Sequence, residues 1–267
     1  MKWLLYICLF VPAFAAAQKE LPVTRVAPGA FAAFAADNLG NLYLLSKENQ
    51  LKKLNVKGDS MGVFNDVRRY GKLYSINAAN PLRTLLYYKD FRTVVVLDRL
   101  MNPVNVIDLR KQNMFQVRAV APAYDNNVWI FDEQESKLKK VDEEGKVALE
   151  TPDLRLVLQE APTPTRLFDQ NGYVYAYDPD KGMFIFDYYG AMKNKLTLLH
   201  WDDVQVIGTD IIGRKDGKVL QYTPGTLDIK ETVIPARFQQ YKDIFITPQG
   251  IYVLEEMGVK LYSFSGF

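Results

Sequence analysis

The feature that most constrains this chain is a loose internal repeat. A turn followed by an apolar strand returns along the sequence, most clearly at 37–45, 124–132, 168–178 and 247–255. Six strand positions are equivalent under this repeat: Leu42, Leu86, Val128, Val174, Ile211 and Ile251. The steps between them are 44, 42, 46, 37 and 40 residues. A near-constant period of this size is typical of folds built by repeating one supersecondary unit.

Each repeat can be divided into four candidate strands. In the first repeat they are 31–36, 41–46, 50–56 and 62–68. The separators carry Asp, Asn and Gly, which accept the positive φ angles of hairpin turns. The fifth repeat, within 204–233, matches least well. Four strands every 40 to 50 residues predict an all-β fold, a six-bladed β-propeller.

The last repeat is one strand short. It supplies candidate strands at 243–246, 251–254 and 259–264, and there the repeat ends. A spare strand-like segment, Leu21 to Val26, precedes the first complete repeat. Pairing the two would remove the exposed edges of an open array. We therefore expect the N-terminal strand to close the last blade.

The first seventeen residues have the pattern of a secretory signal. Lys2 is followed by the apolar run Trp3 to Phe14 and by three alanines, 15–17, and the run is too short to span a bilayer. We expect residues 1–17 to be removed and 18–267 to form one propeller domain. The single cysteine, Cys8, lies in the signal and not at its end, which argues against a lipid anchor. An exported chain without disulfides suggests a bacterial periplasmic, cell-surface or extracellular protein.

The charge balance and the helical content exclude further classes. Lys and Arg number 33 against 31 Asp and Glu, which offers no field for nucleic acid or an anionic membrane. The most helix-like stretch, 155–160, is short and is followed by Pro162 and Pro164. We interpret 151–165 as a connection between blades that crosses one face.

Catalytic signatures are sparse in this sequence. His200 is the only histidine, so a three-histidine zinc site is excluded, and we expect His200 to end a strand and hydrogen-bond a backbone group. Gly-x-Ser-x-Gly occurs once, at 58–62, beside the hairpin turn expected at 57–59 and not between a strand and a helix, and Gly-x-Gly-x-x-Gly and the P-loop are absent. Several acidic residues fall in predicted loops: Asp37, Asp90, Asp125, Glu133, Asp169, Asp178, Asp180 and Asp187. Asp37, Asp125 and Asp169 stand just before turns, so we expect them to bond their own turn backbone rather than a metal.

Aromatic and arginine side chains near strand ends are the best candidates for binding. In Tyr87-Tyr88 and Tyr188-Tyr189, alternation along a strand would send one ring into a blade interface and the other outward. Packing inside the fold is the alternative for every such ring. The candidate binding residues are Arg69, Tyr70, Arg92, Trp129, Tyr188, Trp201 and Arg237. Aromatic rings and arginines are enriched at binding hot spots, which is the reason for this choice.

The repeat also resembles a known group of propellers. Asp-x-x-Gly-Asn-Leu-Tyr at 37–43, followed by Leu51-Lys-Lys-Leu54 and a glycine turn, is similar to the repeats of six-bladed NHL or YWTD-type propellers. At the turn before the second strand of a repeat, Asp-x-x-Gly stands only at 37–40 and 169–172, and no repeat contains Tyr-Trp-Thr-Asp. The resemblance implies a disc with a central channel whose loops bind ligands or proteins, and it transfers no catalytic residue.

The sequence leaves three functions open. The first is a non-catalytic, exported binding or scaffold propeller, without a cofactor, that recruits a protein or glycan of the cell envelope on one face of the disc. The second is a calcium-assisted lactonase or esterase, which would need three or more acidic or amide side chains converging at the channel mouth. The third is a purely structural subunit of an envelope assembly.

Overall fold

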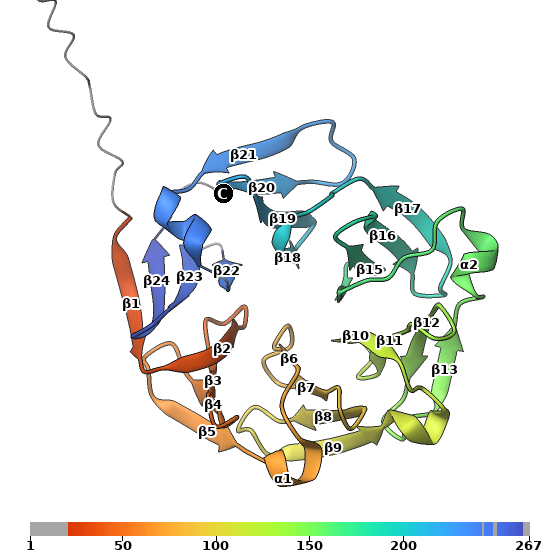
Figure 1. Cartoon of the computed structure of the whole chain (residues 1–267), viewed down its shortest axis with the longest axis horizontal. Helices are drawn as coiled ribbons and strands as arrows, with labels where there is room; N and C mark the ends of the chain where they lie inside the picture. The colour runs from red at the N-terminus through yellow and green to blue at the C-terminus, as the bar shows by residue number, and fades with distance from the viewer. Residues whose placement is uncertain (1–20, 242, 248–249, 264–267) are drawn as a thin grey trace, which may run out of the picture.

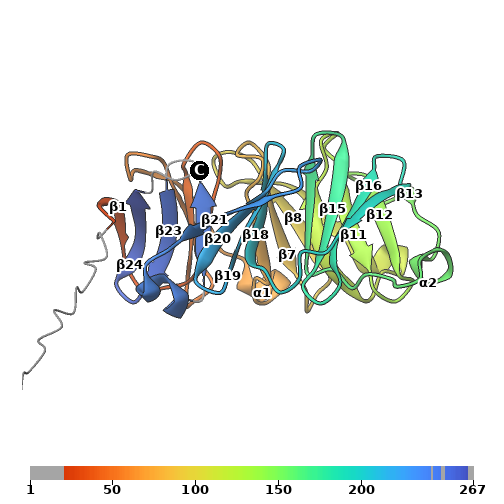
Figure 2. The same ribbon diagram turned by 90° about the horizontal axis from the view of Figure 1, so that it is seen from above.

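The computed structural model describes residues 21–241, 243–247 and 250–263, so the predicted signal at 1–17 lies outside the described residues. In the described part the chain forms six four-stranded sheets arranged radially around a central axis (Figure 1). Seen from the side, the six sheets make a flat disc (Figure 2). The predicted all-β, six-bladed propeller is confirmed. Among these residues no helix is both long and apolar enough to cross a bilayer.

The strands follow one another blade by blade, from the central axis outward. Blade 1 contains β2 Phe31–Ala36, β3 Leu42–Ser46, β4 Leu51–Leu54 and β5 Ser60–Phe64. Blade 2 contains β6 Ser75–Asn77, β7 Thr84–Tyr88, β8 Thr93–Leu97 and β9 Pro103–Asp108. Blade 3 contains β10 Val117–Pro122, β11 Val128–Asp132, β12 Lys137–Val141 and β13 Val147–Glu150. Blade 4 contains β14 Arg166–Gln170, β15 Tyr173–Asp178, β16 Gly182–Asp187 and β17 Met192–Leu196.

Two further blades complete the disc. Blade 5 contains β18 Asp202–Ile207, β19 Asp210–Lys215, β20 Lys218–Tyr222 and β21 Ile229–Val233. Blade 6 contains β22 Ile244–Thr247, β23 Gly250–Glu255, β24 Gly258–Ser263 and, as its outer strand, β1 Val23–Pro28. Four short helices lie in connections between blades: α1 Val67–Tyr70, η1 Leu109–Gln112, α2 Leu154–Val157 and η2 Ala236–Gln240.

The antiparallel order gives the disc two distinct faces. Turns after the first and third strands of each blade lie on one side, which we call the turn face. Turns after the second strand, and the connections to the next blade, lie on the other side, which we call the helical face. Figure 2 shows α1 and α2 on this same side of the disc. Connection 151–165 crosses the helical face as predicted, with α2 inside it.

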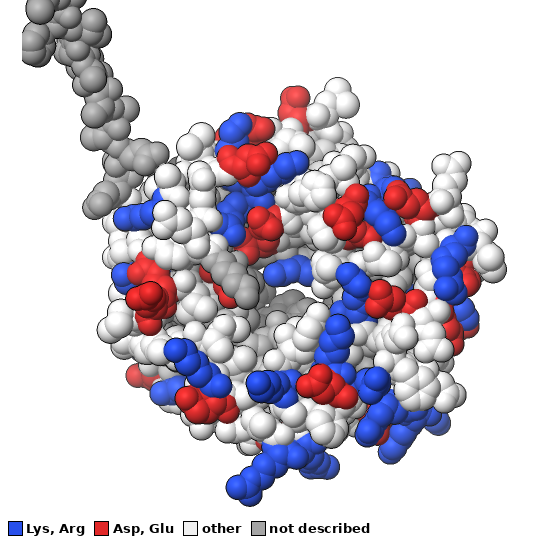
Figure 3. Space-filling model, in the orientation of Figure 1, with Lys and Arg blue, Asp and Glu red and all other residues white. Residues whose placement is uncertain are grey.

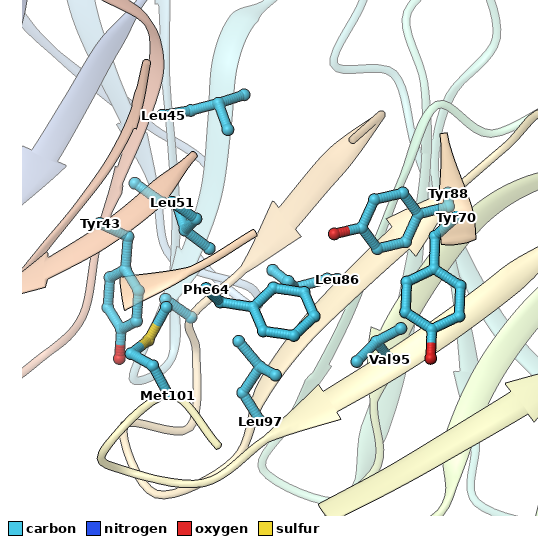
Figure 4. Packing of buried hydrophobic residues seen from close by; sticks show 12 residues of the cluster. Tyr43, Leu45, Leu51, Phe64, Tyr70, Leu86, Tyr88, Val95, Leu97 and Met101 are labelled. Carbon is cyan, nitrogen blue, oxygen red and sulfur yellow. The ribbon is translucent and has the colours of Figure 1, made fainter. Parts of the chain in front are cut away.

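The core consists of six apolar clusters, one in each interface between neighbouring blades. Figure 4 shows the cluster between blades 1 and 2, in which Tyr43, Phe64 and Leu51 of blade 1 meet Leu86 and Val95 of blade 2. Strand alternation divides each blade between two interfaces. Tyr88 lies in the blade 1–2 cluster, whereas its neighbour Tyr87 lies in the blade 2–3 cluster.

The prediction that one ring of Tyr87-Tyr88 would reach outward is wrong. The two side chains are only 1% and 2% exposed. Both faces of a propeller blade are covered by neighbouring blades, so alternation moves a side chain from one interface to the next and not from core to solvent. For Tyr188-Tyr189 the outcome agrees with the prediction, because Tyr188 packs against the blade 3–4 cluster while Tyr189 is 87% exposed. Both residues lie in the turn after β16, so strand alternation is not the cause.

One predicted strand is shorter than expected. The first repeat was expected to continue as a strand to Arg68, but β5 ends at Phe64 and α1 begins at Val67. The Asn65 side chain accepts a hydrogen bond from the Val67 amide at 3.3 Å, which favours a turn there. Tyr70, at the end of α1, is buried in the blade 1–2 cluster, so tertiary packing stabilises this helical turn.

The N-terminal strand pairs antiparallel with the C-terminal one. In β1 and β24, Val26 lies opposite Lys260 and Ala27 opposite Val259. The segment expected at 21–26 is observed two residues later, at 23–28. Arg25 extends this contact to the next blade, because its guanidinium donates hydrogen bonds to the backbone oxygens of Gly40 and Asn55 in blade 1.

We expect Arg25→Ala to lower the free energy of unfolding by about 1–3 kcal/mol, because two backbone oxygens of blade 1 lose their donor. Equilibrium denaturation by urea measures this change. Thr24→Ala is the matched control, since the Thr24 hydroxyl makes only a long contact of 3.4 Å to the Leu261 oxygen. Equal free energies of unfolding for the two variants would show that the Arg25 hydrogen bonds to blade 1 do not stabilise the fold.

We also expect alkaline pH to unfold the protein through its buried tyrosines. Burial raises the pKa of Tyr43, Tyr87 and Tyr88 above the ordinary 10.0. Burial likewise raises the pKa of Tyr177, to about 12. The unfolded chain releases these protons near pH 10.0, so their contribution to stability is intact below that pH and is lost as the pH rises through the folded-state values.

Urea titrations from below pH 10.0 to about pH 12 measure this effect, with tyrosinate absorbance recorded on the same samples. We expect the free energy of unfolding to fall as the pH rises. A constant free energy of unfolding across this range would show that the buried tyrosines do not govern alkaline stability.

Candidate functional site

The seven predicted binding residues do not form one cluster. Five lie on connections or turns of the helical face: Arg69 and Tyr70 in α1, Arg92 in the β7–β8 turn, Trp201 before β18, and Arg237 in η2. The other two lie toward the turn face, Trp129 on β11 and Tyr188 in the β16–β17 turn. The structure brings together Arg69, Tyr70 and Arg92 as one group, and Trp129 with Tyr188 as another.

Three of the predicted rings are packed inside the fold. Trp129 is 0% exposed, and Tyr70 and Trp201 are each 5% exposed. The Trp201 ring packs so closely on Gly213 that a Cβ there would lie 2.8 Å from it. Arg237 lies over the rings of Phe238 and Tyr262, both part of the blade 5–6 cluster. For the rings of Trp129, Tyr70 and Trp201, the packing alternative agrees with the structure, and a role as surface anchors does not.

The first group lies where blades 1, 2 and 3 meet on the helical face. Arg92 has a φ of +51° in the β7–β8 turn, and its Nε donates to the Phe115 oxygen at 2.7 Å. The Arg92 oxygen in turn accepts the Leu109 amide at 3.0 Å, at the start of η1. On the other side, the Phe91 ring lies against Gly71, directly after α1. The β7–β8 turn therefore joins α1 to the η1 connection.

We call this surface the Arg92 patch. It presents three exposed rings, Tyr74 at 55%, Phe91 at 42% and Phe115 at 44%. Its cations are Arg68, Arg69, Lys72, Lys89, Arg92, Arg110 and Lys111, and its acids are Asp66, Asp90 and Asp108. Asp108 is paired with Arg110 at 2.8 Å, and Lys89 lies 4.8 Å from the centre of the Tyr74 ring. The patch thus combines a positive balance with exposed rings.

The second group is organised by Asp169, at the end of β14 on the turn face. Its Oδ1 accepts the hydroxyl of Tyr188. Its Oδ2 accepts the Trp129 Nε1 at 2.9 Å and the backbone amide of Tyr124 at 3.1 Å. Tyr124 and Tyr188 stack with centroids 4.4 Å apart and planes 8° from parallel. Burial, and next the Asp169 carboxylate, raise the pKa of Tyr188 well above its usual value.

A lysine and a second carboxylate complete this group. Lys140 Nζ lies 5.6 Å from the centre of the Tyr124 ring and 5.4 Å from that of Trp129. It forms an ion pair of 2.7 Å with Asp125. Tyr124 is 65% exposed, so the stack opens to solvent. We call Tyr124, Tyr188, Asp169, Lys140 and Asp125 the tyrosine platform.

Sequence reasoning assigned Asp169 to its own turn, and that prediction is wrong. Its hydrogen bonds go to Tyr188 within blade 4 and to blade 3 through Trp129 and Tyr124. For Asp37 the prediction is confirmed, because its carboxylate accepts the amides of Leu39 and Asn41. Asp125 accepts the Asn127 amide at 3.4 Å, so it also serves its own turn.

The calcium alternative concerns the acidic side chains of the loops. Within 21–241, 243–247 and 250–263, no three His, Cys, Asp or Glu side chains are grouped to hold a metal ion. Asp178 and Asp187 accept hydrogen bonds from backbone amides of their turns. His200 does not end a strand as predicted, because β17 ends at Leu196 and β18 begins at Asp202. Its bond to the Pro179 oxygen, 2.8 Å, comes from its backbone amide, and its imidazole, 64% exposed, lies 3.6 Å from the Asp180 carboxylate.

Comparison with known proteins supports the fold. No protein-family profile matches this chain, and no curated protein sequence matches it. Among solved structures, a streptogramin B lyase is 13% identical with a TM-score of 0.59, covering 86% of this chain and 78% of the lyase. Virginiamycin B lyase from Staphylococcus aureus is 13% identical with a TM-score of 0.57, covering 86% and 80%.

A third similar structure is PorZ, a bacterial surface component of the type-IX secretion system of Porphyromonas gingivalis. It is 13% identical with a TM-score of 0.57, and the match covers 90% of this chain but only 33% of PorZ. Identities this low show a shared propeller fold and nothing of the activity. The function must therefore be argued from this chain's own surfaces.

We expect Asp169→Asn to destabilise the protein by about 1–3 kcal/mol. The carboxylate oxygens accept hydrogen bonds from three donors, and the NH2 group of the asparagine cannot accept them. Urea denaturation measures the loss. Asp90→Asn, in an exposed turn of the helical face, is the control and should change stability by less than about 0.5 kcal/mol. If both variants unfold at the same urea concentration, Asp169 does not hold the stack together.

Proposed function

We propose that this protein is an exported, non-catalytic propeller that recruits an acidic segment of a protein partner through the Arg92 patch. One observation carries this proposal: the β7–β8 turn contacts both α1 and the η1 connection, and so brings their arginines and exposed rings onto one surface. Export rests on the signal pattern at 1–17, and it places the partner in the periplasm or at the cell surface.

The composition of the patch fits a protein interface. Arginine and aromatic rings are the residues most enriched where binding energy concentrates. Tyr74, Phe91 and Phe115 supply apolar area that water does not solvate well, and Arg69 and Arg92 supply donors for carboxylates. Rings spread over three connections suit an extended partner surface better than a single small ligand.

The charge of the patch indicates the sign of the partner. The whole chain has a net charge of +2, whereas the segments that form the patch, 66–74, 89–92 and 108–115, together carry seven cations and three acids. Figure 3 shows positive and negative side chains interspersed over most of the helical face, with positive ones gathered over α1. Complementary potentials speed encounter and exclude partners of the same sign.

The test compares two variants with the same change in net charge. The patch variant carries Arg68→Glu, Arg69→Glu and Lys111→Glu, and the control carries Lys57→Glu, Lys146→Glu and Lys230→Glu, all exposed positions away from the patch. Each protein is immobilised and exposed to an envelope extract, and the retained proteins are quantified by mass spectrometry.

We expect at least one acidic protein to be retained by the original chain and by the control but lost from the patch variant. Its affinity, measured with the purified partner, should fall by at least about tenfold in the patch variant. Binding should also weaken between about 0.05 and 0.3 M salt, because exposed charges are screened over such a range. Retention that falls equally in both variants would show that the patch does not bind.

A further inference from the structure

We propose that the tyrosine platform on the turn face is a carbohydrate-binding site, in which the exposed ring of Tyr124 stacks against the apolar face of a sugar ring. This site lies on the opposite side of the disc from the Arg92 patch and does not depend on the function proposed for that patch. Of the platform residues, Tyr188 was a predicted binding residue, whereas Tyr124 and Lys140 were not.

The first support is that the platform is held rigid before any ligand arrives. One carboxylate, Asp169, anchors both halves of the stack through the Tyr188 hydroxyl and the Tyr124 amide. The anchor itself sits on the inner strand of blade 4, and the buried Trp129 donates to it from blade 3. A ring held in place loses little conformational freedom on binding, so more of the contact energy appears as affinity.

The second support is the exposure of the ring. Tyr124 is 65% exposed although one of its faces already stacks on Tyr188. An aromatic ring presented to water in a fixed orientation is an apolar surface of the size of a pyranose ring. Sugars present C–H groups on their flat faces and hydroxyls around their edges, so they need such a surface with polar groups at its border.

The third support is the polar border of the platform. The Lys140 ammonium lies over the Tyr124 ring, 5.6 Å from its centre, and its ion pair with Asp125 supplies both donors and acceptors at the border of the platform. Asn126 and Asn127 belong to the same turn, and both line a small hollow together with Arg83. Hydroxyl groups at the edge of a stacked sugar would find hydrogen-bond partners of both kinds there.

Two other ring-binding ligands fit less well. A proline-rich peptide needs a groove between separated rings, but Tyr124 and Tyr188 stack at 4.4 Å and leave no slot between them. A single-stranded nucleic acid needs cations along its backbone, whereas Lys140 is already neutralised by Asp125. The stack with its one neutral ion pair therefore favours an uncharged sugar.

The test uses the purified full chain and three neutral probes, namely cello-, malto- and chito-oligosaccharides. Binding is detected by saturation-transfer NMR and quantified by titration calorimetry. Tyr124→Ala removes the ring but keeps the backbone amide that Asp169 accepts. Tyr124→Phe keeps the stacking surface, and Tyr74→Ala removes an exposed ring from the opposite face as the matched control.

We expect at least one probe to bind, and Tyr124→Ala to weaken it by about tenfold or more. Tyr124→Phe and Tyr74→Ala should each leave the affinity within about threefold of the original. Thermal melting checks that each variant is folded, and Lys140→Met provides a second reduction in affinity if Tyr124→Ala does not fold.

Several results would overturn the proposal. One is that no probe binds more tightly than about 10 mM. Another is that binding survives in Tyr124→Ala, or is lost equally in Tyr124→Phe. A third is that an oligoproline peptide binds at Tyr124 while no sugar does, which would assign the platform to peptide recognition.

Discussion

The pairing of β1 with β24 is the contact on which the other contacts depend. Each blade covers its two faces with its neighbours, so a blade without a neighbour would expose a whole apolar cluster. The outer strand of blade 6 comes from the other end of the chain, and Arg25 in that strand binds backbone oxygens of blade 1. Closing the ring in this way removes the free edge of β24. Since neighbouring blades share each apolar cluster, closing the ring also fixes the positions of the side chains on both faces of the disc.

Much of this arrangement could be predicted because it depends on local pattern. Turn residues at a steady spacing indicate hairpins, and their number indicates the number of blades. A missing strand at one end and a spare one at the other indicate that the two pair. The pattern could not predict which side chains lie in an interface between blades and which are exposed to solvent. Tyr87 and Tyr88 are both buried because a propeller blade has no solvent side, and a rule based on an ordinary half-exposed sheet places one of them wrongly.

The candidate sites were less predictable because they depend on contacts between distant residues. Asp169 precedes a turn as Asp37 does, and nothing in its own segment distinguishes the two. Its role follows from Trp129 and Tyr124, which belong to another blade and lie about 40 residues earlier. In the Arg92 patch, the sequence identified Arg69, Tyr70 and Arg92, but not which rings would be exposed. Tyr70 is buried because α1 folds back where a strand was expected, while Phe91 and Phe115, in the β7–β8 turn and the η1 connection, are exposed.

The two surfaces differ in the way they are held, and this difference suits different ligands. The Arg92 patch is built on connections joined by the Arg92 side chain, one backbone hydrogen bond and the Phe91 ring, and the cations of α1 lie outside these contacts. The tyrosine platform is anchored on inner strands by one carboxylate, so its ring has little freedom and matches one flat ligand. Since they lie on opposite faces of a rigid disc, occupation of one leaves the other accessible. A propeller with both sites could therefore hold a protein and a glycan at the same time, which is how a small scaffold in a cell envelope would tether one to the other.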